Sequence, residues 1–468
     1  MKKILSIIMA TAITAGLLTG CGNAGTEVKT DEAVTEAATE AEAATETEAA
    51  AEAEEVTEAA AEEGETMNLV GTEITFLNSK GEIQEAVEAM AAEFEAETGI
   101  AVEVQICATG ESPYTKVTSA YNSGTAPTMS MLDITDVVSL AEEYGLDLSN
   151  EKWVGECESQ AIKVNDKVYG FPFCIEGRGI IYNKTAIEST LGREFDPAEV
   201  TGISSLKALC EELRGAGMEN PVVISKEDWS LGNHQLGLVY DTQDGTNDGS
   251  AAFIAKLKDG SASMANNERF DQFIDTFDML KEYNINKEDP LGALYEQDPI
   301  FLVDGDAAFW LNGCWAWPNL AEAGAESTDA YGFISLPFGD DASDFANTSI
   351  EAAATKAVMI DSVQATPEQQ AAAKEFINWI VFNEKGQQML VEECGAIPAC
   401  ANNTFTALDP LGQDIQNRMK EGKTFPSAFV APGDHWSVLG ASMQKYLAGE
   451  SDKEQLAEEI DAYWTALN

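Results

Sequence analysis

The fold is decided by residues 73–106, which read EITFLNSKGEIQEAVEAMAAEFEAETGIAVEVQI. Ile74 and Phe76 belong to a short apolar strand, and residues 100–106 alternate in polarity like a second strand. Between the strands, apolar residues recur at helical spacing at Ile83, Val87, Met90 and Phe94. Gly99 follows as the expected end of the helix. A β-α-β unit of this kind predicts an α/β fold with a parallel sheet.

The same alternation continues along the chain. The stretch DKVYGFPFCIEGRGIIYNK (166–184) predicts a strand, residues 204–215 a helix, and PVVIS (221–225) another strand. Thr366 and Pro367 are placed to begin a long helix, and Ser451 with Glu454 forms the pattern of a capping box before the last one. Alternating strands and helices over this length predict two α/β lobes. Lobe 1 comprises residues 67–176 and 332–391, and lobe 2 comprises 177–331 and 392–468.

The N-terminus carries targeting signals. In residues 1–20, MKKILSIIMATAITAGLLTG, two lysines precede an apolar run of signal-peptide length. Residues 18–21, LTGC, resemble the bacterial lipobox, in which the cysteine is lipidated after cleavage. Acyl chains on Cys21 are sufficient for stable anchoring. We therefore expect a protein anchored by lipid to the outer face of the cell membrane.

Residues 21–66 after this signal are almost entirely Ala, Glu and Thr, with fifteen acidic residues and one lysine. Such a segment cannot bury apolar surface, and its like charges repel, so it predicts an extended spacer. Of the formal charge of −54, the first 20 residues carry +2 and the spacer −14, which leaves −42 on the body. A body this acidic excludes nucleic acid and anionic membrane surfaces as partners.

The sequence lacks the motifs of several classes of enzyme and metal site. The chain has two histidines, His234 and His435, and no H-E-x-x-H, G-x-S-x-G or S-x-x-K pattern, so each histidine is interpreted as a loop or pocket-wall residue. Besides Cys21 there are seven cysteines without a C-x-x-C pair, and a single bridge from Cys394 to Cys400 is the candidate disulfide. We expect no enzyme activity, cofactor or metal. A glycosidase needs only two carboxylates, however, and composition alone does not exclude it.

Three tryptophans lie close together in DGDAAFWLNGCWAWPNL (304–320). Such a run either fills a core or offers flat apolar faces to a ligand. The stretch belongs to an ordered series of motifs: residues 74–104, AYNSGTAPTMSMLDITDVVSLAEEYGLDLS (120–149), KVYGFPFCIEGRGIIYNK (167–184), LVDGDAAFWLNGCWAWPNL (302–320) and GAIPA (395–399). Together with the lipobox, this series resembles the extracellular solute-binding proteins of ABC importers, in the family that includes maltose-binding protein.

The resemblance implies a two-lobed α/β periplasmic-binding-protein fold (type II-like), in which the lobes are joined by a hinge and a sugar site lies in the central ligand cleft. It implies stacking positions at Trp315, Trp229 and Trp436, and an acid at Glu176 that reaches the sugar near the hinge. On the first lobe, the expected hydroxyl acceptors are Asn78, Asp133 and Asp136. Glu227 lies two residues before Trp229, and composition alone adds Tyr114 and Arg178. Asp133 and Asp136 have a second interpretation as caps of the helix that follows them. The tryptophans interpreted as core are Trp310, Trp317, Trp379 and Trp464.

The resemblance also implies a mechanism. The lobes close on an oligosaccharide, for which a maltooligosaccharide is the first candidate, and the closed monomer delivers it to membrane permease subunits. The alternatives are a binding protein for a non-sugar solute, or a surface-anchored carbohydrate-active enzyme or adhesin.

Overall fold

The computed structural model describes residues 67–108, 111–157, 160–326, 328, 330–426 and 431–467. The chain divides into two units, residues 1–65 and 66–468, and every described residue belongs to the second. The predicted signal peptide, Cys21 and the acidic spacer lie outside the described residues. No helix in the described ranges is long and apolar enough to cross a membrane.

A ten-stranded sheet runs through the described part of the chain, in the order β2-β1-β3-β9-β5-β7-β6, with β10 on β9 and with β4 and β8 on β5. Its strands are β1 (Glu73–Asn78), β2 (Ala101–Ile106), β3 (Met129–Asp133), β4 (Ile162–Val164), β5 (Lys167–Asn183), β6 (Val222–Val223), β7 (Phe309–Gly313), β8 (Tyr331–Ile334), β9 (Ile350–Ile360) and β10 (Thr424–Phe425).

The pairing of the sheet differs from the prediction in its centre. Strand β1 pairs in parallel with β2 and β3, and β6 with β7, as β-α-β connections require. Strand β9, however, runs antiparallel to β3 and β5, and β5 runs antiparallel to β7 and β8. The expectation of a parallel sheet is therefore wrong for the centre, because a β-α-β unit fixes the direction only of the strands that it joins.

The helices surround this sheet. The helices up to residue 258 are α1 (Gln84–Thr98), α2 (Pro113–Ser123), α3 (Ile134–Tyr144), α4 (Lys184–Leu191), α5 (Ile203–Gly215), α6 (Leu236–Asp241) and α7 (Asn247–Lys258). The later ones are α8 (Glu268–Glu282), α9 (Asp298–Val303), α10 (Trp317–Glu322), α11 (Phe345–Thr348), α12 (Pro367–Phe382), α13 (Glu384–Gln388), α14 (Pro410–Glu421), α15 (His435–Leu447) and α16 (Lys453–Thr465).

The first β-α-β unit is confirmed. Strand β1, helix α1 and strand β2 occupy the predicted stretches, and α1 buries Met90 and Phe94 completely. Gly99 has a φ of 74°, a left-handed conformation that glycine adopts without steric cost, and its N–H bonds to the carbonyl of Glu95. The helix therefore ends where the sequence predicts.

The two other predicted helix starts have different outcomes. Helix α12 begins with a capping box between Thr366 and Gln369, so this start is confirmed. Helix α16 is capped by Asp452, whose side chain accepts from the N–H of Gln455, so the box predicted for Ser451 and Glu454 is wrong by one residue. Either residue can accept this bond, and the backbone decides which of two neighbours does.

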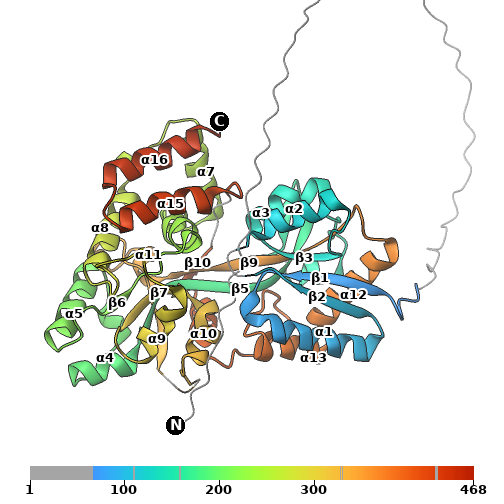
Figure 1. Cartoon of the computed structure of the whole chain (residues 1–468), viewed down its shortest axis with the longest axis horizontal. Coiled ribbons are helices and arrows are strands. Elements are labelled where there is room, and N and C mark those ends of the chain that lie inside the picture. Colours follow the sequence, from blue (N-terminus) through green and yellow to red (C-terminus); the bar gives the residue numbers. More distant parts are fainter. Residues whose placement is uncertain are drawn as a thin grey trace, which may run out of the picture. The chain divides into compact units, whose positions relative to one another are not determined.

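Strands β5 and β9 connect the hydrophobic cores. Phe171 and Phe173, early in β5, pack in a core built around α1 and α12, whereas Ile180 packs with α5 and α8. Strand β9 likewise contributes Ile360 to the first of these cores and Ile350 to a core under β7. Figure 1 shows β5 and β9 side by side between α1, α2 and α3 on one side and α4, α5 and α8 on the other. The residue ranges given above for two lobes remain a prediction.

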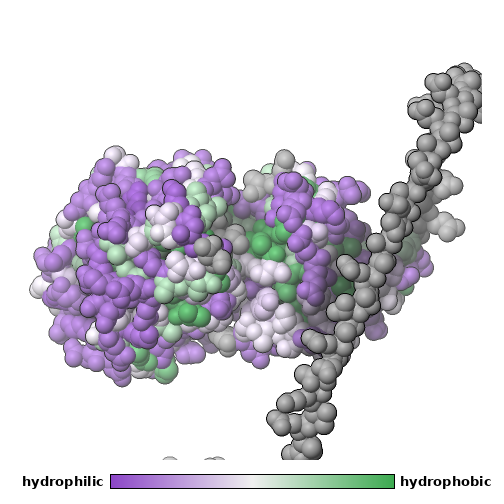
Figure 2. All heavy atoms as spheres, turned by 90° about the horizontal axis from the view of Figure 1, so that it is seen from above, coloured by the Kyte–Doolittle hydropathy of each residue, from purple (hydrophilic) through white to green (hydrophobic). Residues whose placement is uncertain are grey.

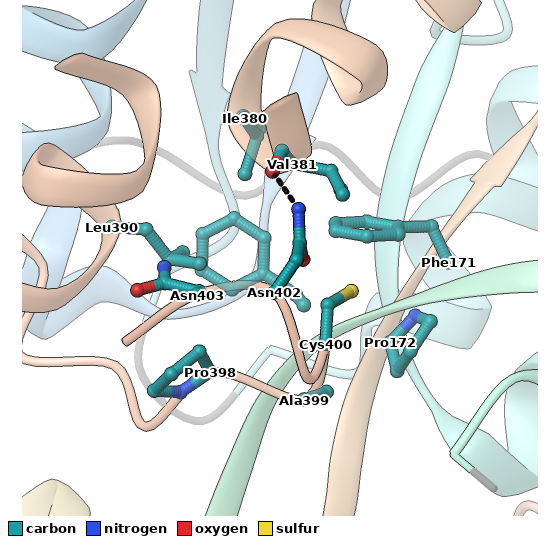
Figure 3. Close-up of a pocket in the computed structure, with 11 residues that line it drawn as sticks. Phe171, Pro172, Ile380, Val381, Leu390, Pro398, Ala399, Cys400, Asn402 and Asn403 are labelled. Atoms are coloured by element: carbon teal, nitrogen blue, oxygen red, sulfur yellow. Dashed lines mark hydrogen bonds between the residues drawn. The ribbon is translucent and has the colours of Figure 1, made fainter. Parts of the chain in front are cut away.

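One disulfide joins Cys157 to Cys400, with a Cα–Cα distance of 4.2 Å. Cys394, the partner predicted for Cys400, is a free buried thiol, so that prediction is wrong. The bridged residues are 243 positions apart, and only the fold brings them together. Figure 3 shows the hollow beside Cys400, where the side-chain amide of Asn402 donates to the carbonyl of Val381. Its volume of about 10 Å³ is at the lower limit for one water molecule.

Hydrophilic residues cover most of the face of the body that Figure 2 shows. The formal charge of the whole chain is −54, so most of its charged surface is anionic. A polyanion that approaches such a surface is repelled.

Candidate functional site

A cavity of about 840 Å³ is lined by the turn after β1, by β5, by the segment after β7 and by residues 391–396. This volume is within the range of about 300 to 1,000 Å³ that small-molecule sites occupy. The turn after β1 supplies Lys80 and Glu82, and β5 supplies Glu176. The segment after β7 supplies Trp315 and Trp317. The cavity therefore combines two indole rings with charged groups from three separate stretches of the chain.

The position of Trp315 follows from the strand before it. Strand β7 pairs with β5 so that Gly313 lies opposite Arg178, and the one-turn helix η7 (Cys314–Ala316) follows at once. The ring of Trp315 folds back over Gly313, where a Cβ would lie 2.1 Å from Cζ3 of the indole. A Cβ at position 313 therefore forces the ring to move. The N–H of Gly177 donates to the sulfur of Cys314 over 3.4 Å, which holds η7 beside β5.

Aromatic rings continue away from Trp315 in a row. The imidazole of His234 lies 4.6 Å from the indole of Trp315, and the indole of Trp229 lies 5.3 Å from His234, between ring centroids. Tyr295 follows, 5.4 Å from Trp229 and 5.7 Å from Trp310. Edge-on and tilted contacts at these distances stabilise aromatic clusters. Trp229 is thus connected to Trp315 through His234, although it does not line the cavity.

His234 is uncharged at neutral pH. Burial, and the nearby cations Arg178, Lys356 and Lys80, hold the pKa of His234 well below its usual value. His234 lines a small pocket together with Arg178 and Asn312, so its interpretation as a pocket-wall residue is confirmed.

Glu176 is held by two protein groups. Lys80 pairs with its Oε1 and the hydroxyl of Thr355 donates to its Oε2. Burial pushes the pKa of Glu176 up, but the charge of Lys80 and these hydrogen bonds outweigh it, so the pKa lies below its usual value. Burial alone lowers the pKa of Lys80, and Glu176 and Glu82 together raise it well above the usual value. Both groups are therefore charged at neutral pH, and each carboxylate oxygen has a further lone pair for a ligand.

Lys80 is a site residue that the sequence analysis missed. Its Nζ also lies 2.7 Å from Oε1 of Glu82. Asn78 fixes the turn that presents it, because its Oδ1 accepts from the N–H of Lys80 and its Nδ2 donates to the carbonyl of Lys80, each over 2.9 Å. The only sequence signal was the position of Lys80 two residues after the strand end at Asn78. Asn78 itself is fully buried, so it supports the site and does not face the ligand space.

The two aspartates and Tyr114 lie elsewhere in the body. Asp133 pairs with Lys356 over 2.7 Å and occupies the N-cap position of α3 without a side-chain capping bond. Asp136 is buried, and burial and the charge of Asp133 raise its pKa. A Cβ on Gly433 would lie 3.6 Å from Oδ1 of Asp136 and 4.0 Å from Tyr114, so the segment before α15 packs against both. None of these residues lines the 840 Å³ cavity.

The remaining candidates have varied surroundings. Arg178 is buried, and its Nε donates to Glu351 over 2.7 Å, so its charge is matched within the protein. Glu227 is half-buried, and within the described ranges its Oε2 has no hydrogen-bond partner. Burial raises the pKa of Glu227. Trp436, the second residue of α15, is half-buried and lies three residues after Gly433.

The tryptophans interpreted as core separate into two groups. Trp310, Trp379 and Trp464 are buried, as predicted. Trp317 is half-buried: it packs against the core that holds Trp310 and also lines the cavity, so its assignment to the core alone is incomplete. It is the first residue of α10, and the proline that follows fits this first turn.

The indole N–H groups distinguish these two groups as well. The Nε1 atoms of the buried tryptophans donate to Ser225 Oγ at 2.9 Å, Glu97 Oε2 at 2.7 Å and Tyr240 Oη at 3.1 Å, from Trp310, Trp379 and Trp464 respectively. Within the described part of the chain, Trp315 and Trp317 make no such bond. Their N–H groups are available to a ligand.

Comparison with known proteins places the chain in a family. The family model described as bacterial extracellular solute-binding protein matches residues 89–407. The chain therefore belongs to this family. No curated protein sequence matches it.

Solved structures share the fold at low sequence identity. The solute-binding protein RafE in complex with raffinose has a TM-score of 0.67 and 19% identity, over 85% of this chain and 99% of that one. A chitin oligosaccharide binding protein has a TM-score of 0.65 and 19% identity, over 84% and 98%. A sugar transporter from Bacillus licheniformis in complex with stachyose has a TM-score of 0.64 and 18% identity, over 85% and 100%. The predicted α/β solute-binding protein fold is thereby confirmed.

Proposed function

We propose that this member of the extracellular solute-binding proteins is the substrate-binding component of a carbohydrate ABC importer. It captures an oligosaccharide and delivers it to permease subunits in the membrane. The observation that carries the proposal is the placement of Trp315, Glu176 and Lys80 around one cavity of about 840 Å³. Maltooligosaccharides remain the first candidate ligands. The similar structures add raffinose and stachyose, with which two of them were solved, and chitin oligosaccharides, for which a third is named.

The chemistry of the cavity suits a neutral sugar. One face of a pyranose ring presents C–H groups, which pack on an indole such as that of Trp315. The hydroxyls at the ring edge need hydrogen-bond partners once water is displaced, and the carboxylate of Glu176 and the ammonium of Lys80 supply both acceptors and donors.

Charge also favours a neutral ligand over an anionic one. Among the described residues that line the cavity, seven are acidic and Lys80 is the one basic residue. Lys80 is already paired with Glu176 and Glu82. A sugar acid or phosphate ester in this cavity would meet repulsion without a free cation to offset it.

The proposed mechanism needs no covalent step. The body opens and closes by bending of β5 and β9, the strands shared between the cores, and the closed form is the one that the permease recognises. Lipid on Cys21 and the acidic spacer of residues 21–66 hold the body at the outer face of the membrane. The protein acts as a monomer without a cofactor.

Titration calorimetry of the purified protein with maltose, maltotriose, raffinose, stachyose and chitotriose tests the function. We expect saturable binding of at least one of these sugars, weakened at least about tenfold by Trp315→Ala, which removes a stacking surface and its N–H donor. The matched control is Trp379→Phe in the core, which leaves affinity unchanged.

No binding of any of these sugars by the folded protein would contradict the proposal and favour a non-sugar solute. Release of reducing ends from a bound sugar would favour a carbohydrate-active enzyme instead.

A further inference from the structure

The cavity extends beyond Trp315. Trp317 and Glu322, the first and last residues of α10, both line it, as does Pro318 between them. Trp315 is tied to the Glu176 side of the cavity, since it follows Cys314, whose sulfur accepts from the N–H of Gly177, the residue after Glu176. Trp317 lies two residues farther along the chain, at the start of α10, whose last residue Glu322 also lines the cavity.

The ring of Trp317 has a fixed orientation but is not enclosed by the core. It packs edge-on against Tyr331 with 5.9 Å between ring centroids, which fixes its orientation. It remains half-buried, and no residue in the described ranges accepts its indole N–H. A fixed aromatic surface with an unused donor, in the wall of a cavity, is suited to contact a sugar ring and one of its hydroxyls.

We propose that Trp317 is a second stacking surface, which makes the site selective for the length of the oligosaccharide. The inference rests on the proposed function and deepens it. Trp315 packs against one sugar unit near Glu176, and Trp317 packs against a unit farther along the same chain. A short sugar bound at Trp315 gains nothing from Trp317, whereas a longer one contacts both rings.

The test compares matched variants in their affinity for a series of sugars of increasing length. Wild type, Trp317→Ala, Trp317→Phe and the core control Trp464→Phe are titrated calorimetrically with maltose, maltotriose and maltotetraose, and with raffinose and stachyose, which differ by one sugar unit. We expect Trp317→Ala to weaken the binding of the tetrasaccharides by about threefold to tenfold, and the binding of the disaccharide by less than about twofold. Trp317→Phe, which keeps a flat ring but lacks the N–H, falls between wild type and Trp317→Ala.

Three results would count against the inference in distinguishable ways. Equal losses for all lengths, or no loss at any length, would overturn the length selectivity while wild-type binding leaves the proposed function standing. No binding of any of these sugars by wild type would overturn the proposed function, and the inference with it. If thermal unfolding shows that Trp317→Ala does not fold, the length dependence of Trp317→Phe decides alone.

Discussion

Trp310 and Trp315 are five residues apart and have opposite environments. Trp310 lies within β7, is completely buried, and donates its indole N–H to Ser225. Trp315 lies beyond the end of the same strand, is half-buried, and keeps its N–H free of partners in the described part of the chain. The difference teaches that residue type does not distinguish a core tryptophan from a site tryptophan. Strand pairing and the hydrogen bond of the indole do.

The comparison predicts that two alanine substitutions differ in their effects on stability and on ligand binding. Trp310→Ala leaves a large internal cavity and an unpaired Ser225, and is expected to lower the free energy of unfolding by about 3 to 5 kcal/mol. Trp315→Ala loses only partly buried surface, and is expected to lower the free energy of unfolding by about 1 to 2 kcal/mol. The same substitution weakens the binding of the ligand. Urea denaturation of both variants measures this difference, and equal losses would remove the basis for separating them.

The hydrogen-bond chain behind Trp310 predicts a pH dependence. Ser225, which accepts from Trp310, donates to Asp298 Oδ2 over 2.6 Å. Burial and the charges of Glu227 and Glu296 raise the pKa of Asp298 to about 7, from 3.8. Between these pH values the folded state keeps a proton that the unfolded state has released, so this group's contribution is full below about pH 4 and is lost as pH rises through about 7.

Asp298→Asn should flatten this fall in stability, which is at most about 4 kcal/mol in the wild type. Denaturation midpoints at pH 5 and pH 8 measure the effect. Parallel profiles for wild type and variant would show that Asp298 is not the group responsible.

The ion pair between Lys80 and Glu176 in the cavity wall can be tested by substitution. Lys80 and Glu176 expose only 8% and 9% of their side chains, so Lys80→Met leaves a buried carboxylate without its partner. We expect a loss of about 3 kcal/mol in the free energy of unfolding, and partial recovery when Glu176→Gln is added. A double variant no more stable than Lys80→Met would argue against the pairing.

The smallest expected effect tests whether Gly313 is needed to position the ring of Trp315. Gly313→Ala places a methyl group against the ring of Trp315. Displacement of the ring should weaken the binding of the oligosaccharide by about tenfold. Gly155→Ala is the matched control, because nothing lies within 4 Å of its added Cβ. Fluorescence titration compares the two, and equal affinities would mean that Trp315 does not need this position.

Local signals were read correctly from the sequence where they act over a few residues. Gly99 ends α1, and Thr366 caps α12, because each of these interactions is complete within one turn of helix. The cap of α16 at Asp452 shows the limit of such signals, since two neighbouring residues are chemically able to accept the same bond.

The errors concern pairs that only the fold creates. Cys157 meets Cys400 across 243 residues, and Lys80 meets Glu176 across 96, so no spacing in the sequence indicates either pair. The antiparallel centre of the sheet has the same origin, because β5 and β9 are not joined by a β-α-β connection. The exposure of Trp317 has a similar origin, because it depends on where α10 begins and on how that helix packs.

A crystal structure of the protein with the tightest-binding oligosaccharide of the titration series tests the central claim most directly. We predict a sugar ring packed on the indole of Trp315, with hydroxyls bonded to Glu176 or Lys80 inside the cavity. A sugar bound elsewhere, with the Trp315 ring uncovered, would contradict the account.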